Sequence, residues 1–160
     1  MDKKGMTFIE LITVIAIMSI IFLIALPKTT IALNFKERKD LMELKRDILY
    51  ARNMSIMDVK RYSLEVYPKK GYYYINKHDN EKQISRIKKK VFESNLKIIF
   101  VNFNGSNNNE FGQLLFSITG APSMGGNIQL KNSKCQNIKL TIEVATGKVN
   151  TYIDGEKQDE

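Results

Sequence analysis

The feature that most constrains this chain is an apolar run of 21 residues, from Met6 to Leu26, with one charged side chain, Glu10. At about 1.5 Å per residue, a helix of this length reaches about 31 Å, enough to cross the hydrocarbon core of a bilayer. A carboxylate in such a helix is costly in lipid and needs a partner. The sequence therefore predicts a membrane helix in which the carboxylate of Glu10 must be paired.

The flanks of the run leave its orientation in the membrane open. They also argue that the run is neither a secretory signal peptide nor a plain single-pass anchor. Lys3 and Lys4 suit a cytoplasmic N-terminus, but basic residues also follow the run, so the positive-inside rule does not decide. A secretory signal peptide needs a shorter apolar core and a small-residue cleavage site, and neither is present. A plain single-pass anchor explains neither Glu10 nor Gly5.

The residues at positions 4–11, Lys-Gly-Met-Thr-Phe-Ile-Glu-Leu, followed by an apolar helix, resemble the N-terminus of type IV prepilins and pseudopilins. The resemblance implies that a prepilin peptidase cuts after Gly5 on the cytoplasmic side of the membrane. It implies that the same enzyme methylates the new amine of Met6. It also implies that Glu10 acts in subunit assembly and that Pro27 bends the helix, as a proline often does in pilins.

A charge pair gives Glu10 a physical role. After cleavage, an adjacent subunit can bring the amine of its own Met6 to this carboxylate. Opposite charges in a low-dielectric helix bundle attract strongly when paired and are penalised when alone, so the pair would set the axial register between subunits. The alternative is that Glu10 is an interfacial carboxylate at the lipid headgroups.

A second helical pattern follows the apolar run. Residues 36–57 lack Gly and Pro, and apolar or small side chains recur there at helical spacing: Leu41, Leu44, Ile48, Ala51 and Ser55. This narrow stripe must lie against another surface. We predict one long helix over 6–57, transmembrane or fibre core over 6–26 and packed on a domain over its second half.

Residues 58–160 have the texture of antiparallel sheet. Alternating runs and turns predict seven or so strands, with a hairpin at 62–75; residues 83–92 are either a basic connector or two short strands. The fold class is therefore α+β, with a long N-terminal helix packed on a C-terminal antiparallel β-sheet domain. The resemblance makes this a pilin fold, with 1–5 as leader peptide.

The C-terminal half is similar to the GspH/FimT group of minor pilins and pseudopilins. The similarity rests on a spaced pattern of glycines and apolar residues: Gly112, Phe116, Gly120, Gly126, Ile138, Val144 and Gly147-Lys148. That group includes subunits of type II secretion systems, type IV pili and competence pili. The resemblance implies that other pilin subunits are partners.

The composition offers little chemistry. With one cysteine and one histidine, the chain predicts no internal disulfide, no cysteine-based metal cage, no cofactor and no enzyme. We expect Cys135 to be a small buried hydrophobe in a strand. We expect His78, among charged residues, to be a solvated loop residue.

A basic region is the one candidate binding surface. Residues 60–97 carry 11 basic and 4 acidic side chains, nearly the whole net charge of +8, and several tyrosines. Such a mixture suits contact with DNA or another anion, and the candidate residues are Arg86, Lys88, Lys89 and Lys90. A solvated sheet face, or attraction to anionic lipid or cell-wall polymers, explains the same composition.

The sequence favours a minor pilin or pseudopilin. Its precursor would sit in the cytoplasmic membrane as a single-pass protein with its N-terminus in the cytoplasm, and would then join a fibre outside the membrane. A DNA-binding subunit of a competence pilus, using residues 60–97, is the first alternative. A membrane-anchored domain that is never processed is the second.

Overall fold

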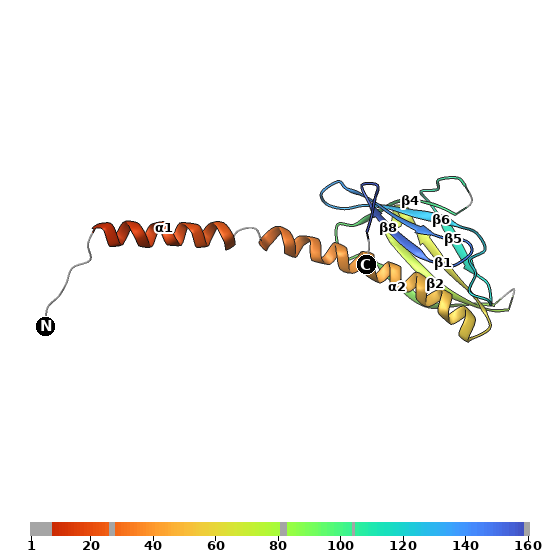
Figure 1. Ribbon diagram of the computed structural model, residues 1–160. Helices are drawn as coiled ribbons and strands as arrows, with labels where there is room; N and C mark the ends of the chain where they lie inside the picture. The colour runs from red at the N-terminus through yellow and green to blue at the C-terminus, as the bar shows by residue number, and fades with distance from the viewer. Residues whose placement is uncertain (1–7, 26–27, 81–82, 104, 159–160) are drawn as a thin grey trace. The chain divides into compact units, whose positions relative to one another are not determined.

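The computed structural model describes residues 8–25, 28–80, 83–103 and 105–158 (Figure 1). The chain divides into two compact units, Met1–Lys36 and Glu37–Glu160. The predicted cleavage residues Gly5 and Met6, and the predicted bend at Pro27, lie outside the described residues.

Helix α1 (Phe8–Ala25) is apolar on all sides. Its described side chains up to Ile21 are exposed, among them Phe8 at 79% and Ile20 at 59%. The hydroxyl of Ser19 donates to the carbonyl of Ile15 at 2.8 Å, and that of Thr13 to the carbonyl of Ile9, so these polar groups are satisfied within the helix. A helix that is apolar all round requires apolar surroundings.

The expected span over Met6–Leu26 is only partly described, because Met6, Thr7 and Leu26 are not among the described residues. Within the described ranges, no helix combines the length and the apolar character that crossing a membrane requires. Of the helix predicted over 6–57, the described residues comprise α1 and a second helix, α2 (Lys28–Met57), and residues 26–27 lie outside the described ranges.

The second unit holds the rest of α2 and two antiparallel sheets. The first sheet has the order β3-β2-β1-β5 and the second β4-β6-β7-β8-β9. The strands are β1 (Arg61–Tyr67), β2 (Tyr72–Asn80), β3 (Gln83–Val91), β4 (Lys97–Asn102), β5 (Gly112–Phe116), β6 (Gly126–Lys131), β7 (Asn137–Ile142), β8 (Val149–Ile153) and β9 (Glu156–Lys157). The α+β class is confirmed.

The core forms where α2 meets both sheets. Leu44, Ile48 and Ala51 of α2 are buried, as the stripe predicted, with Leu41 packed partly buried beside them. The sheets contribute alternate strand residues, as period-two side chains must. The buried strand residues include Leu64, Val66, Tyr73 and Ile75 in the first sheet and Ile128, Leu130, Leu140 and Ile142 in the second.

The predicted hairpin at 62–75 is confirmed, since β1 and β2 pair antiparallel from Arg61↔His78 to Tyr67↔Tyr72. A short 3-10 helix, η1 (Pro68–Lys70), makes the turn, and Gly71 closes it in the left-handed region at φ 68°. Only glycine and a few small polar residues take this conformation easily.

Three local expectations were wrong or only partly right. Residues 83–91 form one strand, β3, rather than a connector or two short strands. Cys135 is exposed in the β6–β7 turn at φ 63°, because a turn rather than a strand follows β6. His78 lies in β2 rather than in a loop, and its Nε2 is 2.9 Å from the hydroxyl of Ser63. Burial lowers the pKa of His78.

Candidate functional site

Of the residues predicted to act in processing and assembly, Glu10 is among the described residues, whereas Gly5 and Met6 are not. Glu10 lies in the first turn of α1, where its side chain is exposed. Gly5 and Met6, the residues at which cleavage and methylation were predicted, are outside the described residues.

The basic candidates of β3 are divided between two faces of the first sheet. Lys88 and Lys90 pair with Ile75 and Tyr73, which point into the core. Lys89 pairs with Tyr74, and a register shift at Ile87 lets Arg86 pair with Asn76. Because this β-bulge adds one residue, Arg86 lies on the same face as Lys89, not as Lys88.

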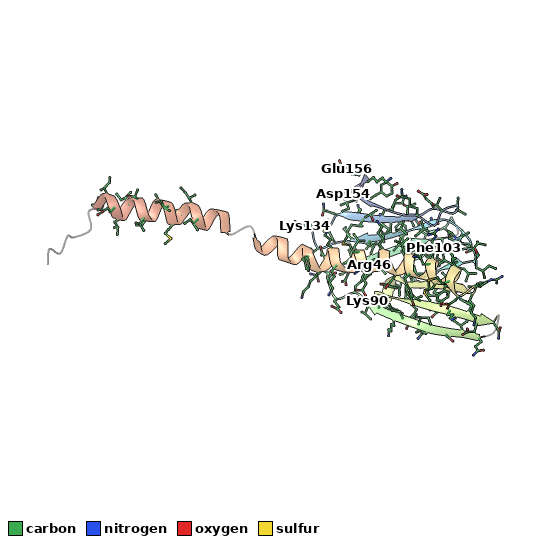
Figure 2. All side chains as sticks on the ribbon, turned by 60° about the horizontal axis from the view of Figure 1, so that its bottom comes forward. Arg46, Lys90, Phe103, Lys134, Asp154 and Glu156 are labelled. Atoms are coloured by element: carbon green, nitrogen blue, oxygen red, sulfur yellow. The ribbon has the colours of Figure 1, made fainter. Side chains whose placement is uncertain are left out.

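Lys88 and Lys90 are bound to acidic side chains of α2. The Nζ of Lys88 lies 2.9 Å from Glu43 and 2.8 Å from Asp47. The Nζ of Lys90 lies 2.9 Å from Glu43, and Figure 2 labels it beside α2. The expectation that all four basic residues form one contact surface was therefore wrong, because these two hold the helix.

The carboxylates of α2 and the strand side chains that contact them shift one another's pKa values. Hydrogen bonds from Lys88 and Lys90 lower the pKa of Glu43 to about 2. Burial, and the bond that its hydroxyl donates to Asp47, raise the pKa of Tyr73. The pKa of Lys90 is raised, chiefly because it donates to Glu43. These groups therefore stay charged, or in Tyr73's case neutral, across the ordinary pH range.

Two further carboxylates of α2 receive backbone N–H groups. Asp40 accepts from the amides of Glu93 at 3.0 Å and Ser94 at 2.9 Å, between β3 and β4. Glu37 accepts from the amide of Ser133 at 2.8 Å, in the turn between β6 and β7. Acidic residues at positions 37, 40, 43 and 47 thus tie one helix to both sheets. The sequence carried the signal, since their spacing places them on one side of a helix.

The opposite face of the first sheet presents aromatic rings and cations. The guanidinium of Arg86 lies 3.6 Å from the centre of the Tyr74 ring. The Nζ of Lys89 lies 5.0 Å from the centre of the Tyr72 ring, and that of Lys70 lies 5.7 Å from that of Tyr67. Such distances are typical of cation–π contacts. Arg86 and Lys89, the other half of the predicted anion contact, are therefore exposed on a second surface.

The described part of the chain offers no cluster of three or more His, Cys, Asp or Glu residues able to hold a metal ion. On one face of the first sheet, Lys88 and Lys90 form ion pairs with α2. On the other face, Arg86 and Lys89 are exposed beside aromatic rings.

Comparison with known proteins adds to this geometry. Residues 1–26 match the prokaryotic N-terminal methylation motif. The structure is similar to the minor pseudopilin EpsH from the type 2 secretion system of Vibrio cholerae, with a TM-score of 0.58 and 8% identity over 74% of this chain and 98% of that one. The chain has the pilin fold.

A second solved structure with the pilin fold is similar as well. It is the type IV minor pilin FimU of Pseudomonas aeruginosa, with a TM-score of 0.55 and 16% identity over 78% of this chain and 97% of that one. No curated protein matches the sequence. The predicted resemblance to type IV minor pilins and pseudopilins is confirmed, by the motif at the N-terminus and by the fold of the domain.

Proposed function

We propose that this chain is a minor pilin or pseudopilin, a structural subunit that a prepilin peptidase cuts after Gly5 and methylates at Met6. The observation that carries the proposal is the coincidence of two independent features in one chain. The N-terminal methylation motif covers residues 1–26, and a domain with the pilin fold follows it. Each feature by itself would leave the role open.

The exposed apolar surface of α1 supports assembly. Large side chains are exposed on every side of the helix, including Ile9 at 72%, Ile15 at 58% and Ile21 at 54%. In the precursor, the run from Met6 to Leu26 holds the chain in the cytoplasmic membrane with its N-terminus in the cytoplasm. In the fibre, helices of neighbouring subunits replace the lipid around α1, and the domain lies outside.

Glu10 supplies the register of that assembly. Its carboxylate receives the amine of Met6 from an adjacent subunit once the leader is removed. Within a bundle of apolar helices the effective dielectric constant is low, so a displaced pair would be strongly disfavoured. The partners of this chain are therefore the prepilin peptidase and other pilin subunits, and its role is structural rather than enzymatic.

The processing step is tested by the mass of the mature protein. Expressed with a prepilin peptidase, the wild-type chain should begin at a methylated Met6. Gly5→Val should keep the leader, because the side chain obstructs the cleaved bond, whereas Lys4→Gln should still be cut. A chain that retains Met1 in the presence of active peptidase would contradict the proposal and favour an unprocessed membrane-anchored domain.

A DNA-uptake pilus is the second candidate machine. The observation that favours it is the exposure of Arg86 and Lys89 on the solvent side of β3. Lys88 and Lys90 do not support it, because they are paired with α2. Deletion of the chain should then abolish uptake of added DNA without reducing protein secretion; the reverse result would favour a secretion pseudopilus.

A further inference from the structure

One face of the first sheet combines a group of aromatic rings with three cations. We call this surface the tyrosine face. Its rings are those of Tyr67, Tyr72, Tyr74 and Phe111, and its cations are Lys70, Arg86 and Lys89. The other face of the same sheet packs on the core and α2, so the tyrosine face is the side of this sheet left to the solvent.

The rings form one contiguous group. The centre of the Tyr67 ring lies 5.0 Å from that of Tyr72 and 5.2 Å from that of Phe111. Tyr72 and Tyr74 are also 5.0 Å apart. Tyr74 is buried beneath Arg86, whereas Phe111 is 40% exposed and Tyr72 is half-buried. Accessible aromatic surface therefore remains at Tyr72 and Phe111.

The three cations are held by rings rather than by carboxylates. Among residues 8–25, 28–80, 83–103 and 105–158, no carboxylate forms an ion pair with Lys70, Arg86 or Lys89. Glu65, a carboxylate on this face, lies 3.4 Å from the hydroxyl of Tyr67 and 3.3 Å from the side-chain amide of Gln113. Glu65 therefore offsets one of the three positive charges of the tyrosine face, and the face keeps a net positive charge within the described residues.

The combination of rings and cations on this surface favours one class of polyanion. An antiparallel sheet with rings and cations side by side can take unstacked bases on its rings while its cations neutralise phosphates. A duplex hides the faces of its bases, so it could use the cations alone. An acidic polysaccharide or polypeptide likewise has no base to stack. We propose that the tyrosine face binds single-stranded nucleic acid, and this inference holds whether or not Gly5 is cleaved.

The proposed contacts have separate roles. Lys70, Arg86 and Lys89 each neutralise a phosphate, so the logarithm of the association constant should fall against that of salt with a slope of about −2 for three contacts. Tyr72 and Phe111 each stack on a base. Loss of one stacking ring should weaken binding by about 5-fold to 150-fold.

The test is a fluorescence anisotropy titration of the full chain in detergent micelles with a labelled oligothymidylate. The variant K70Q/R86Q/K89Q should bind at least about tenfold more weakly than wild type and show a shallower salt slope. The control variant K131Q/K134Q/K139Q removes the same charge from exposed positions of the second sheet or its turns. It should stay close to wild type, and thermal unfolding should show that both variants are folded.

The aromatic part is tested by Tyr72→Leu, which should weaken binding, and by Tyr72→Phe, which keeps the ring and should restore it. Equal losses in the two triple variants would overturn the proposal, since the effect would then be one of net charge. A duplex of the same length, or dextran sulfate, bound as tightly as the oligothymidylate and insensitive to Tyr72→Leu would overturn it too. So would absence of binding at low salt.

Discussion

The hydroxyl of Tyr73, on the inner strand β2 of the first sheet, donates a hydrogen bond of 2.6 Å to the carboxylate of Asp47 on α2. The ring of Tyr73 is fully buried and Asp47 is 7% exposed. Lys88 binds the same carboxylate from the neighbouring strand. One carboxylate thus joins the helix to two strands inside the domain, where an unpaired charge would be costly.

Tyr73→Phe should lower the free energy of unfolding of the domain by about 1.5–3 kcal/mol, because it removes a buried hydrogen bond to a charged group. Urea unfolding followed by circular dichroism measures the loss. Tyr50→Phe is the matched control, since Tyr50 lies on the exposed side of α2. A Tyr73→Phe variant as stable as this control would show that Lys88 alone satisfies Asp47.

Acid should weaken the attachment of α2 through Glu43. The folded-state pKa of this group is lowered from 4.5 to about 2, so its contribution to stability is present above pH 4.5 and is lost as the pH falls towards about 2. Urea midpoints should therefore fall between about pH 5 and pH 2, and less steeply in Glu43→Gln. Glu110→Gln, which removes an exposed partner of Lys69, is the control and should keep the wild-type slope. Parallel profiles for all three proteins would contradict this role.

Glu10→Ala should abolish incorporation of the chain into fibres while leaving the unfolding of the domain unchanged, because the second compact unit starts at Glu37. Sheared fibres probed with an antibody to the domain report incorporation. Ser19→Ala, which removes a hydroxyl satisfied within α1, should assemble normally. Wild-type amounts of Glu10→Ala in fibres would refute the proposed charge pair.

Gly126→Ala should destabilise the pairing of β4 and β6. A Cβ at this position would lie 2.1 Å from the backbone oxygen of Asn102 and 2.7 Å from the ring of Phe103, so the strands would have to move. Overpacking of this kind costs about 1–3 kcal/mol. Gly71→Asn is a useful comparison, because the space there is open and asparagine tolerates the left-handed region. Similar unfolding curves for the two variants would mean that β4 shifts at little cost.

Patterns of short range made most of the fold predictable. The apolar stripe of α2 predicted which side of the helix is buried. The alternating residues on either side of Pro68 to Gly71 predicted a hairpin. The Cys135 turn was missed although residues 131–137, Lys-Asn-Ser-Lys-Cys-Gln-Asn, are polar and include Asn and Ser, which are typical of turns.

The candidate contact surface was less predictable, because it depends on register. From composition, Arg86, Lys88, Lys89 and Lys90 formed one basic run. Their faces are decided by the pairing of β3 with β2 and by the extra residue at Ile87. The acidic partners on α2 are more than 40 residues away in sequence from Lys88, and no local pattern relates the two.

The bulge at Ile87 also bears on how this hairpin tolerates changes in length. A chain without Ile87 would keep Arg86 beside Lys89 and Lys88 beside Lys90, because a regular strand of one residue fewer has the same alternation. In a chain without Lys89, the side chains that precede Lys90 in β3 would change faces. Lys88 would then point to the solvent and away from Asp47. Ile87 can therefore be lost without changing which face each neighbouring side chain occupies. The positions of Lys88 and Lys90 are fixed, because both side chains bind α2.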